Sequence, residues 1–296
     1  MTAPNVSTTD TSTPPTTAEK AVRPDKPRRY GPIGLMLTAA AAGLWAAWTS
    51  GIDPAAILRG PQQLLRILGL MLLPPDIGTV PGALGGMLES LQIAWVGTMI
   101  GAVISLPLGL LAAKNVGGRL STTVSRQVLN LLRSLPELVL AILFVSMIGL
   151  GPLAGALAIG LGSIGTLGKL TAEVVEGIDR GPIEAAEAVG GSRFQVLRWG
   201  VMPQALPEIM AFWLYRFEIN VRASAILGLV GAGGIGGMLA NFLSYRRYAA
   251  AGMAILIVIA TTIAIDMVSS RIRRRIIAGP SGPMPKADPV PAADAL

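Results

Sequence analysis

Long apolar runs, separated by short charged segments, constrain this chain more than any other feature of its sequence. Only 14% of the residues are charged, against roughly 25% in soluble domains, and the mean hydropathy is +0.60. A run of about 20 apolar residues is long enough for a helix to cross the hydrocarbon core of a bilayer. The apolar runs cover about 33–49, 89–113, 128–150, 152–171, 206–230 and 249–269. The sequence therefore predicts an all-α membrane protein of about six transmembrane helices.

The segments outside the main apolar runs differ from one another in composition. Residues 1–30 are rich in Thr, Pro and Ala, and residues 278–296 in Pro and Ala, which predicts two disordered tails. The first transmembrane helix is expected at 31–50. Segment 51–88 is mixed, and its short apolar run at 64–73 predicts an interfacial or re-entrant helix on the extracytoplasmic side.

A secretory signal peptide is the alternative interpretation of the first apolar run, because small residues are frequent near Ala46 and Ala47. The charged leader before this run is long, however. Trp45 and Trp48 also have the character of anchors at a membrane interface. We therefore favour an uncleaved first helix.

The basic residues predict the orientation of the chain, because cytoplasmic loops of membrane proteins are enriched in Lys and Arg. Six spans place both termini on one side, which carries Lys20, Arg23, Lys26, Arg28, Arg29, Lys114, Arg119, Arg126, Arg180, Arg193, Arg198, Arg271, Arg273, Arg274 and Arg275. The opposite side carries Arg59, Arg66, Arg246 and Arg247. Both termini are therefore expected in the cytoplasm. The net charge of +7 is explained by this topology, so no nucleic-acid partner is expected.

The chain contains no histidine and no cysteine. This excludes disulfides, Cys/His metal sites and every catalytic arrangement that needs either residue. The segment 231–236 matches the pattern G-x-G-x-x-G, but it follows an apolar span rather than a strand, so we reject a dinucleotide site. Gly168 and Lys169 lack the Ser or Thr that must follow in a phosphate-binding loop. No catalytic residue, metal or cofactor is expected.

Two further patterns concern the packing of the helices. Pro107 and Pro136 lie inside predicted spans and should kink them where neighbours or water satisfy the freed carbonyl groups. Gly97, Gly101 and Ser105 recur every four residues, which indicates close contact between two helices rather than a site.

Segment 181–204 is a polar helix-turn-helix pattern inside the predicted transmembrane core, which extends over 89–270. Pro182 suits the first turn of a helix, and the carboxylate of Glu184 complements the helix dipole there. The glycine pair that begins at Gly190 ends this helix with a turn. From the residues alone, a knob that docks on a soluble partner and an amphipathic helix on the membrane surface are equally good interpretations.

The second half of this segment is expected to contain another helix, from Arg193 to Trp199. Pro203 and Pro207 mark the return of the chain to the membrane.

Several segments resemble a known family. Glu184, Ala185, Ala186 and Gly190, followed by Pro203, resemble the cytoplasmic coupling loop of ABC importer permeases. The segments that resemble the phosphonate-type branch of these permeases are Arg133–Leu138, Gly149–Gly155, Lys169–Glu173, Glu176–Asp179, Leu214–Arg222 and Leu227–Gly236. The resemblance covers about residues 75–277. It implies the architecture of a type I ABC importer permease with a cytoplasmic coupling helix.

The resemblance also implies a location and a set of partners. The chain would lie in the bacterial inner membrane beside a second permease subunit, either a copy of itself or a paralogue. A cytoplasmic ABC ATPase dimer and an extracytoplasmic substrate-binding protein would complete the importer, and the five loop residues would contact the ATPase. Gly200 and Met202 depart from the loop pattern, which has Ile and Leu there.

The cargo that the resemblance implies is phosphonate or a related phosphorus oxyanion, such as phosphite or a phosphate ester. Another small solute, such as methionine or an osmolyte, is the alternative within the same class.

Charged residues within the predicted spans form a second candidate site. Its members are Glu137, Arg216, Glu218, Asn220 and Arg222. Arg216, Glu218 and Arg222 are costly in lipid and should face the bundle interior or an aqueous path. Glu218 and Arg222 lie four residues apart and can pair, whereas Arg216 needs another partner, for which Glu137 or Glu89 is available. Two interpretations stay open: contact with an anionic substrate, or a structural ion-pair network, which we favour because acidic partners exist.

Two other classes of function were weighed against the importer permease. A secondary transporter or channel would explain the intramembrane charges, but it gives no reason for the 181–204 loop, and the two halves of the chain show no evident inverted repeat. An intramembrane enzyme with Ser-Lys chemistry would need a lysine within a span, whereas Lys169 lies at the end of one. The importer permease is therefore the favoured function.

Overall fold

The structure is a computed structural model that describes residues 30–51 and 54–278. The two predicted tails and the basic cluster at 20–29 lie outside these residues, apart from Tyr30 and Ala278. The chain divides into two units, Met1–Pro61 and Gln62–Leu296, which are treated separately below. Within the described residues every regular element is a helix, as the sequence predicted.

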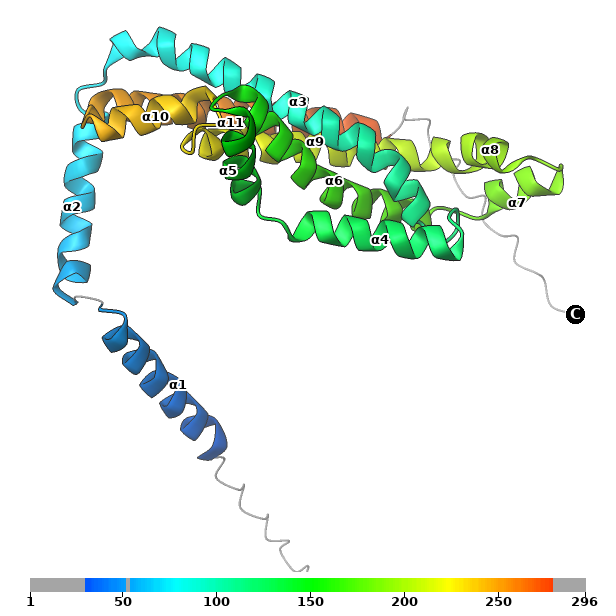
Figure 1. Cartoon of the computed structure of the whole chain (residues 1–296), viewed down its shortest axis with the longest axis horizontal. Helices are drawn as coiled ribbons and strands as arrows, with labels where there is room; N and C mark the ends of the chain where they lie inside the picture. Colours follow the sequence, from blue (N-terminus) through cyan, green and yellow to red (C-terminus); the bar gives the residue numbers. More distant parts are fainter. Residues whose placement is uncertain (1–29, 52–53, 279–296) are drawn as a thin grey trace, which may run out of the picture. The chain divides into compact units, whose positions relative to one another are not determined.

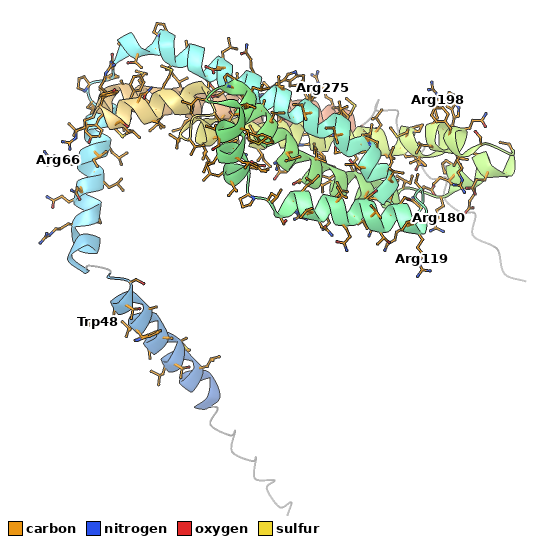
Figure 2. All side chains as sticks on the ribbon, in the orientation of Figure 1. Trp48, Arg66, Arg119, Arg180, Arg198 and Arg275 are labelled. Atoms are coloured by element: carbon orange, nitrogen blue, oxygen red, sulfur yellow. The ribbon has the colours of Figure 1, made fainter. Side chains whose placement is uncertain are left out.

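The described part of the first unit consists of α1 (Tyr30–Thr49) and the beginning of α2 (Pro54–Leu72). The side chains of α1 are described from Gly34 onward, and nearly all of them are exposed although most are apolar. Trp48 is the most exposed of the large ones, at 88% (Figure 2). Exposed apolar side chains along a whole helix are typical of a helix that lies in lipid.

The second unit contains the rest of the helices, which pack into one bundle (Figure 1). In chain order they are η1 (Ile77–Thr79), α3 (Val80–Ala112), α4 (Arg119–Ser134), α5 (Glu137–Ile148), α6 (Pro152–Gly177), α7 (Gly181–Ala188), α8 (Arg193–Gln195), η2 (Val196–Val201), α9 (Met202–Gly228), α10 (Gly234–Ser244) and α11 (Tyr248–Ala278). The short α7 and α8 lie together at one end of this bundle.

Three helices of the described part are long and apolar enough to cross a membrane. They cover Ile77–Ala112, Pro152–Gly177 and Tyr248–Ile276. A fourth candidate is α4 together with α5, which are bent by 83°. The predicted fifth span, now α9, is not among these candidates because Glu208, Arg216, Glu218 and Arg222 interrupt its apolar sequence.

The predicted span at 128–150 is bent by 83° between α4 and α5, at the position where the sequence predicts a kink. Leu135 is extended, with φ −81° and ψ 121°, and it ends α4. Pro136 causes this conformation, because its ring disfavours helical geometry in the preceding residue and it has no N–H for the helix. Pro107, by contrast, lies inside α3, which continues through it as one helix.

The contact between α3 and α6 forms the centre of the bundle and depends on small residues. A Cβ added to Gly97 would lie 2.9 Å from the carbonyl oxygen of Ala156, and one added to Gly109 would lie 2.8 Å from that of Gly168. The two backbones therefore touch along several turns. This confirms the close packing that the four-residue spacing indicated, and it is the means by which helices associate in lipid.

The glycine-rich segment after α9 forms a turn and then a helix. Gly231, Gly233 and Gly234 have positive φ angles of 93°, 83° and 72° in this turn. The chain then enters α10, whose first turn is fixed by a hydrogen bond of 3.0 Å from the Ile235 N–H to Ser90 Oγ. Ser90 of α3 thus binds a free N–H group at the start of α10, and the sequence around α10 does not predict this contact.

The α3–α6 contact predicts the effect of adding one methyl group. Gly97→Ala should destabilise the folded chain by about 1–3 kcal/mol, because the new Cβ meets both Ala156 O and Ile159. Gly85→Ala is the matched control on the same helix, since a Cβ there meets nothing within 4 Å. Thermal unfolding in detergent, followed by tryptophan fluorescence, measures both. Equal midpoints for the two variants would contradict the prediction.

Candidate coupling and translocation sites

The first candidate site is the exposed end that α7 forms. Asp179 Oδ1 accepts a hydrogen bond of 3.0 Å from the Gly181 N–H, which fixes the start of this helix. Glu184, Ala185 and Gly190 are exposed, and Ala186 is half-buried.

The chain turns sharply after α7 at its two glycines. Gly190 has a φ of +78°, and the Gly191 N–H donates a hydrogen bond of 3.0 Å to the carbonyl oxygen of Ala186. The turn expected at this glycine pair is therefore present. Glu184, Ala185, Ala186 and Gly190 all lie in α7 or in the turn that follows it.

The sequence predicts that the second helix of the loop ends at Trp199, but in the structure the helix continues beyond this residue. Ser192 and Gln195 form a reciprocal capping box that starts α8. The chain then continues through η2, a π-helical segment, directly into α9. Pro203 lies in the first turn of α9, where a missing N–H is tolerated. One uninterrupted helix therefore joins the loop to the interior of the bundle.

A joint holds the start of α7 against the start of α9. Gln204 Oε1 accepts a hydrogen bond of 3.2 Å from the Asp179 N–H, and Gln204 Nε2 donates one of 3.3 Å to the Asp179 carbonyl oxygen. A Cβ at Gly200 would lie 3.2 Å from the Ile183 Cα. The glycine that departs from the family loop pattern thus permits close approach of the two helices.

The exposed end also presents large apolar side chains beside basic ones. Val189, Phe194 and Trp199 are 86%, 69% and 68% exposed. Arg180 and Arg198 lie at the same end of the bundle, as does Arg119 at the start of α4 (Figure 2). Apolar side chains with this exposure mark a surface that is suited to a partner.

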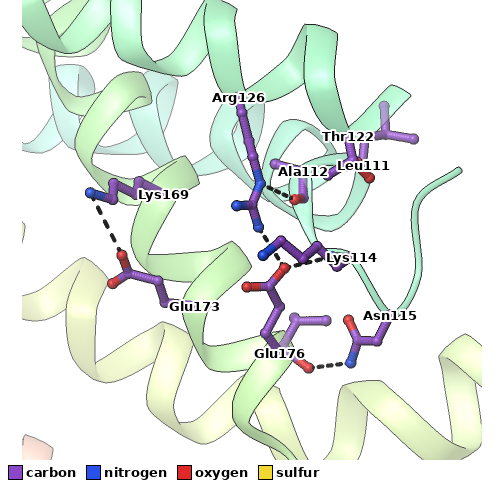
Figure 3. A network of polar contacts seen from close by, with 10 residues as sticks. Leu111, Ala112, Lys114, Asn115, Thr122, Arg126, Lys169, Glu173 and Glu176 are labelled. Carbon is purple, nitrogen blue, oxygen red and sulfur yellow. Dashed lines mark hydrogen bonds and ion pairs between the residues drawn. The ribbon is translucent and has the colours of Figure 1, made fainter. Parts of the chain in front are cut away.

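A polar network ties α3, α4 and α6 together near this end (Figure 3). Glu176 Oε1 accepts hydrogen bonds from the Lys114 N–H, at 2.6 Å, and from Arg126 Nη2. Arg126 Nε also donates to the Ala112 carbonyl oxygen at 2.9 Å, and Asn115 Nδ2 donates to the Val175 carbonyl oxygen at 2.6 Å. The last carbonyl groups of α3 and α6 are satisfied in this way.

The second candidate site contains Arg216 in a buried polar cluster. Arg216 forms an ion pair with Glu137 of α5 and donates a hydrogen bond of 3.0 Å to Ser163 Oγ of α6. Asn220 Nδ2 donates to the same oxygen at 3.1 Å and to Thr98 Oγ1 of α3 at 2.8 Å. Of the two carboxylates that the sequence offered, Glu137 and Glu89, Glu137 is the partner of Arg216. The sequence analysis missed Ser163 and Thr98, although each is a hydroxyl residue inside an apolar run.

Glu218 and Arg222 form the other expected pair, at 3.0 Å. The side chain of Glu218 is only 8% exposed, whereas that of Arg222 is 53% exposed. The two arginines of α9 therefore differ. Arg216 is enclosed among α5, α6 and α9, and Arg222 reaches the surface of the described bundle.

Comparison with known proteins identifies the family. Residues 105–278 match the model of the binding-protein-dependent transport system inner membrane component. The chain is 37% identical over 233 residues to the phosphite transport system permease protein PtxC of Stutzerimonas stutzeri, covering 78% of this chain and 84% of that protein. It is 41% identical over 190 residues to the phosphate-import permease protein PhnE of Mycolicibacterium smegmatis, covering 64% of this chain and 36% of that protein.

A solved structure shares the fold. The MetNI methionine ABC transporter, in an inward-facing conformation, aligns with 68% of this chain and 99% of its own, with a TM-score of 0.61 and 23% sequence identity. The chain thus belongs to the family of ABC importer permeases, the inner membrane components of binding-protein-dependent transport systems. As such a component it is a membrane subunit and not an enzyme.

The buried cluster predicts a strong effect of removing one charge. Glu137→Gln should destabilise the chain by about 3–5 kcal/mol, because it leaves the buried Arg216 without a carboxylate. The double variant Glu137→Gln with Arg216→Gln should recover part of this loss. Thermal midpoints in detergent measure both, and a double variant no more stable than Glu137→Gln alone would show that the pair contributes no such coupling.

Proposed function

We propose that this chain is the permease subunit of an ATP-driven importer that forms the path for a phosphorus oxyanion, such as phosphonate, phosphite or a phosphate ester. The observation that carries the proposal is the 37% identity, over 78% of the chain, to a permease of a phosphite transport system. The 41% identity to a phosphate-import permease supports the same class of cargo. Methionine is the alternative cargo, which the 23% identity to MetNI does not favour.

The proposed arrangement in the membrane has about six spans and both termini in the cytoplasm. It adds α1 and the charged α9 to the candidate spans described above. The clustering of Arg119, Arg180 and Arg198 at the α7 end supports a cytoplasmic location for that end, because basic residues accumulate there.

The coupling proposal assigns the exposed α7 end to the ATPase. Glu184, Ala185, Ala186 and Gly190 form its surface, and Pro203 begins the helix that leads from it into the membrane. The exposed apolar side chains beside them support a soluble protein as the partner. An ATPase dimer would dock here on two permease subunits, and a substrate-binding protein would dock on the opposite side of the membrane.

The translocation proposal separates the two arginines of α9. Arg216, with Glu137 and Asn220, braces the bundle, because every one of these side chains contacts a neighbouring helix. Arg222 lines the path between two copies of the chain, where its guanidinium suits oxyanions. Its pairing with Glu218 weakens that attraction, and weak binding favours release of the cargo.

The coupling proposal predicts the loss of ATPase association in Gly190→Asp. The new carboxylate would enter the contact surface. We expect the affinity for the ATPase to fall by at least about tenfold, which corresponds to about 1.4 kcal/mol. Glu184→Lys should have the same effect.

Gly149→Asp is the matched control, since Gly149 also has a positive φ, of 94°, and also has open space around it. Gly149 lies between α5 and α6, whereas Gly190 lies in the turn after α7. Co-purification of the tagged permease with the ATPase measures the effect. Normal recovery of the ATPase with Gly190→Asp would refute the assignment of this end.

The cargo proposal predicts ATP-dependent uptake of labelled phosphonate, phosphite or phosphate ester into proteoliposomes. Uptake should require the permease, its ATPase and its binding protein together. Arg222→Gln should reduce it severalfold and Arg222→Lys should reduce it less, because lysine keeps the charge but lacks the planar set of donors. Uptake without the ATPase would indicate a secondary transporter, and stimulated ATP hydrolysis with none of these anions carried would refute the cargo alone.

A further inference from the structure

Arg133 lies at the middle depth of the bundle. The backbone of α4 packs against Gly165, where an added Cβ would lie 2.6 Å from the Arg133 N and 2.9 Å from the Leu129 carbonyl oxygen. Gly165 is the midpoint of α6, 13 residues after Pro152 and 12 before Gly177. It is therefore roughly 20 Å from either end of a helix that is long enough to span the bilayer. Arg133 shares this depth.

The side chain of Arg133 is exposed at this depth and forms no ion pair within the part of the chain that the structure describes. Arg119 at the start of α4 and Arg271, Arg273, Arg274 and Arg275 at the end of α11 likewise form no ion pair among the described residues, but they lie near helix ends. Four other cations on the membrane helices each have a carboxylate neighbour. These pairs are Arg126 with Glu176, Lys169 with Glu173, Arg216 with Glu137, and Arg222 with Glu218. An arginine inside the hydrocarbon core is costly unless it faces protein or water. Arg133 therefore does not face lipid.

The neighbours of Arg133 on α4 are polar and exposed as well. Thr123, Gln127, Asn130 and Ser134 are all exposed, and their spacing of three or four residues places them along one face of the helix. A hollow of about 290 Å³ opens beside Asn130, lined also by the charged side chains of α4 and α6 described above. Polar side chains on a membrane helix face water or protein.

The break between α4 and α5 gives a separate indication. Ser134, Leu135 and Pro136 are all exposed where the helix is interrupted. Non-helical backbone at membrane depth is tolerated only where it is enclosed by protein or lines a water-filled cavity. The polar face of α4 and this break are therefore both expected to face protein or water rather than lipid.

We propose that Arg133 is an anion-binding residue in the aqueous translocation path, which the polar face of α4 lines. The inference rests on the proposed function and deepens it, because it names an unneutralised positive charge that an oxyanion would meet inside the bundle. A guanidinium offers a planar set of donors that fits two oxygens of such an anion.

The absence of cysteine from the chain permits a direct test. Asn130→Cys places a thiol three residues from Arg133 on the exposed side of α4, and Val103→Cys places one on the apolar, 67% exposed surface of α3. Each full-length variant is placed in lipid nanodiscs, which are open on both sides. The rates of modification by a negatively and a positively charged methanethiosulfonate reagent are then measured and normalised to a free thiol.

We expect Asn130→Cys to react much faster than Val103→Cys, and to prefer the negative reagent. Adding Arg133→Gln should lower that preference by about fivefold, the size expected for one charge roughly 7 Å away in water. Arg133→Lys should retain it. Gln127→Cys, one turn further from Arg133, should show a weaker preference.

Two results would overturn the proposal. Reaction of Asn130→Cys as slow as that of Val103→Cys would show that this face is sealed by lipid or by a second subunit. A reagent preference unchanged by Arg133→Gln would show that the charge is neutralised in the assembled protein. Neither measurement needs ATPase, binding protein or cargo, so a failure here is distinct from a failure of the uptake experiment.

Discussion

The contact between α3 and α6 is the interaction on which the rest of the bundle depends. In lipid, apolar side chains gain little by leaving the solvent, so helices associate through close packing and polar contacts. Glycines on both helices bring the backbones together, and this places Thr98 of α3 near Ser163 of α6. Asn220 of α9 then donates to both hydroxyl groups, and Arg216 donates to that of Ser163. The position of α9 is thus a consequence of small residues on two other helices.

The charges of the membrane helices divide into two kinds once their surroundings are known. Arg216 is enclosed and satisfied by Glu137 and Ser163, which makes it a brace. Arg222 is half-exposed beside a buried carboxylate. Arg133 is exposed with no carboxylate neighbour in the described chain. All three residues are arginines in membrane helices, so residue type alone does not distinguish them. Their contacts show which charge is structural and which charges remain available to an anion.

Much of this arrangement was predictable from the sequence. The helical class, the packing of Gly97, the turn at Gly190 and the partner of Arg216 all follow from local spacing or from the cost of charge in lipid. Three features were not predictable. The size of the 83° bend after α4 exceeds the kink that Pro136 predicts, and the capping of α10 by Ser90 depends on a neighbouring helix. The continuity of α8 with α9 depends on a π-helical segment, which carries no evident sequence signal.

That continuity has a mechanical consequence. Arg193–Gly228 is one continuous helical segment, so roughly 40 Å of helix separates its exposed start from Asn220. The π-helical segment, Pro203 and Pro207 lie between these two points, and such features allow a helix to bend. A displacement at the exposed end therefore reaches the polar cluster only to the extent that this stretch of helix stays straight.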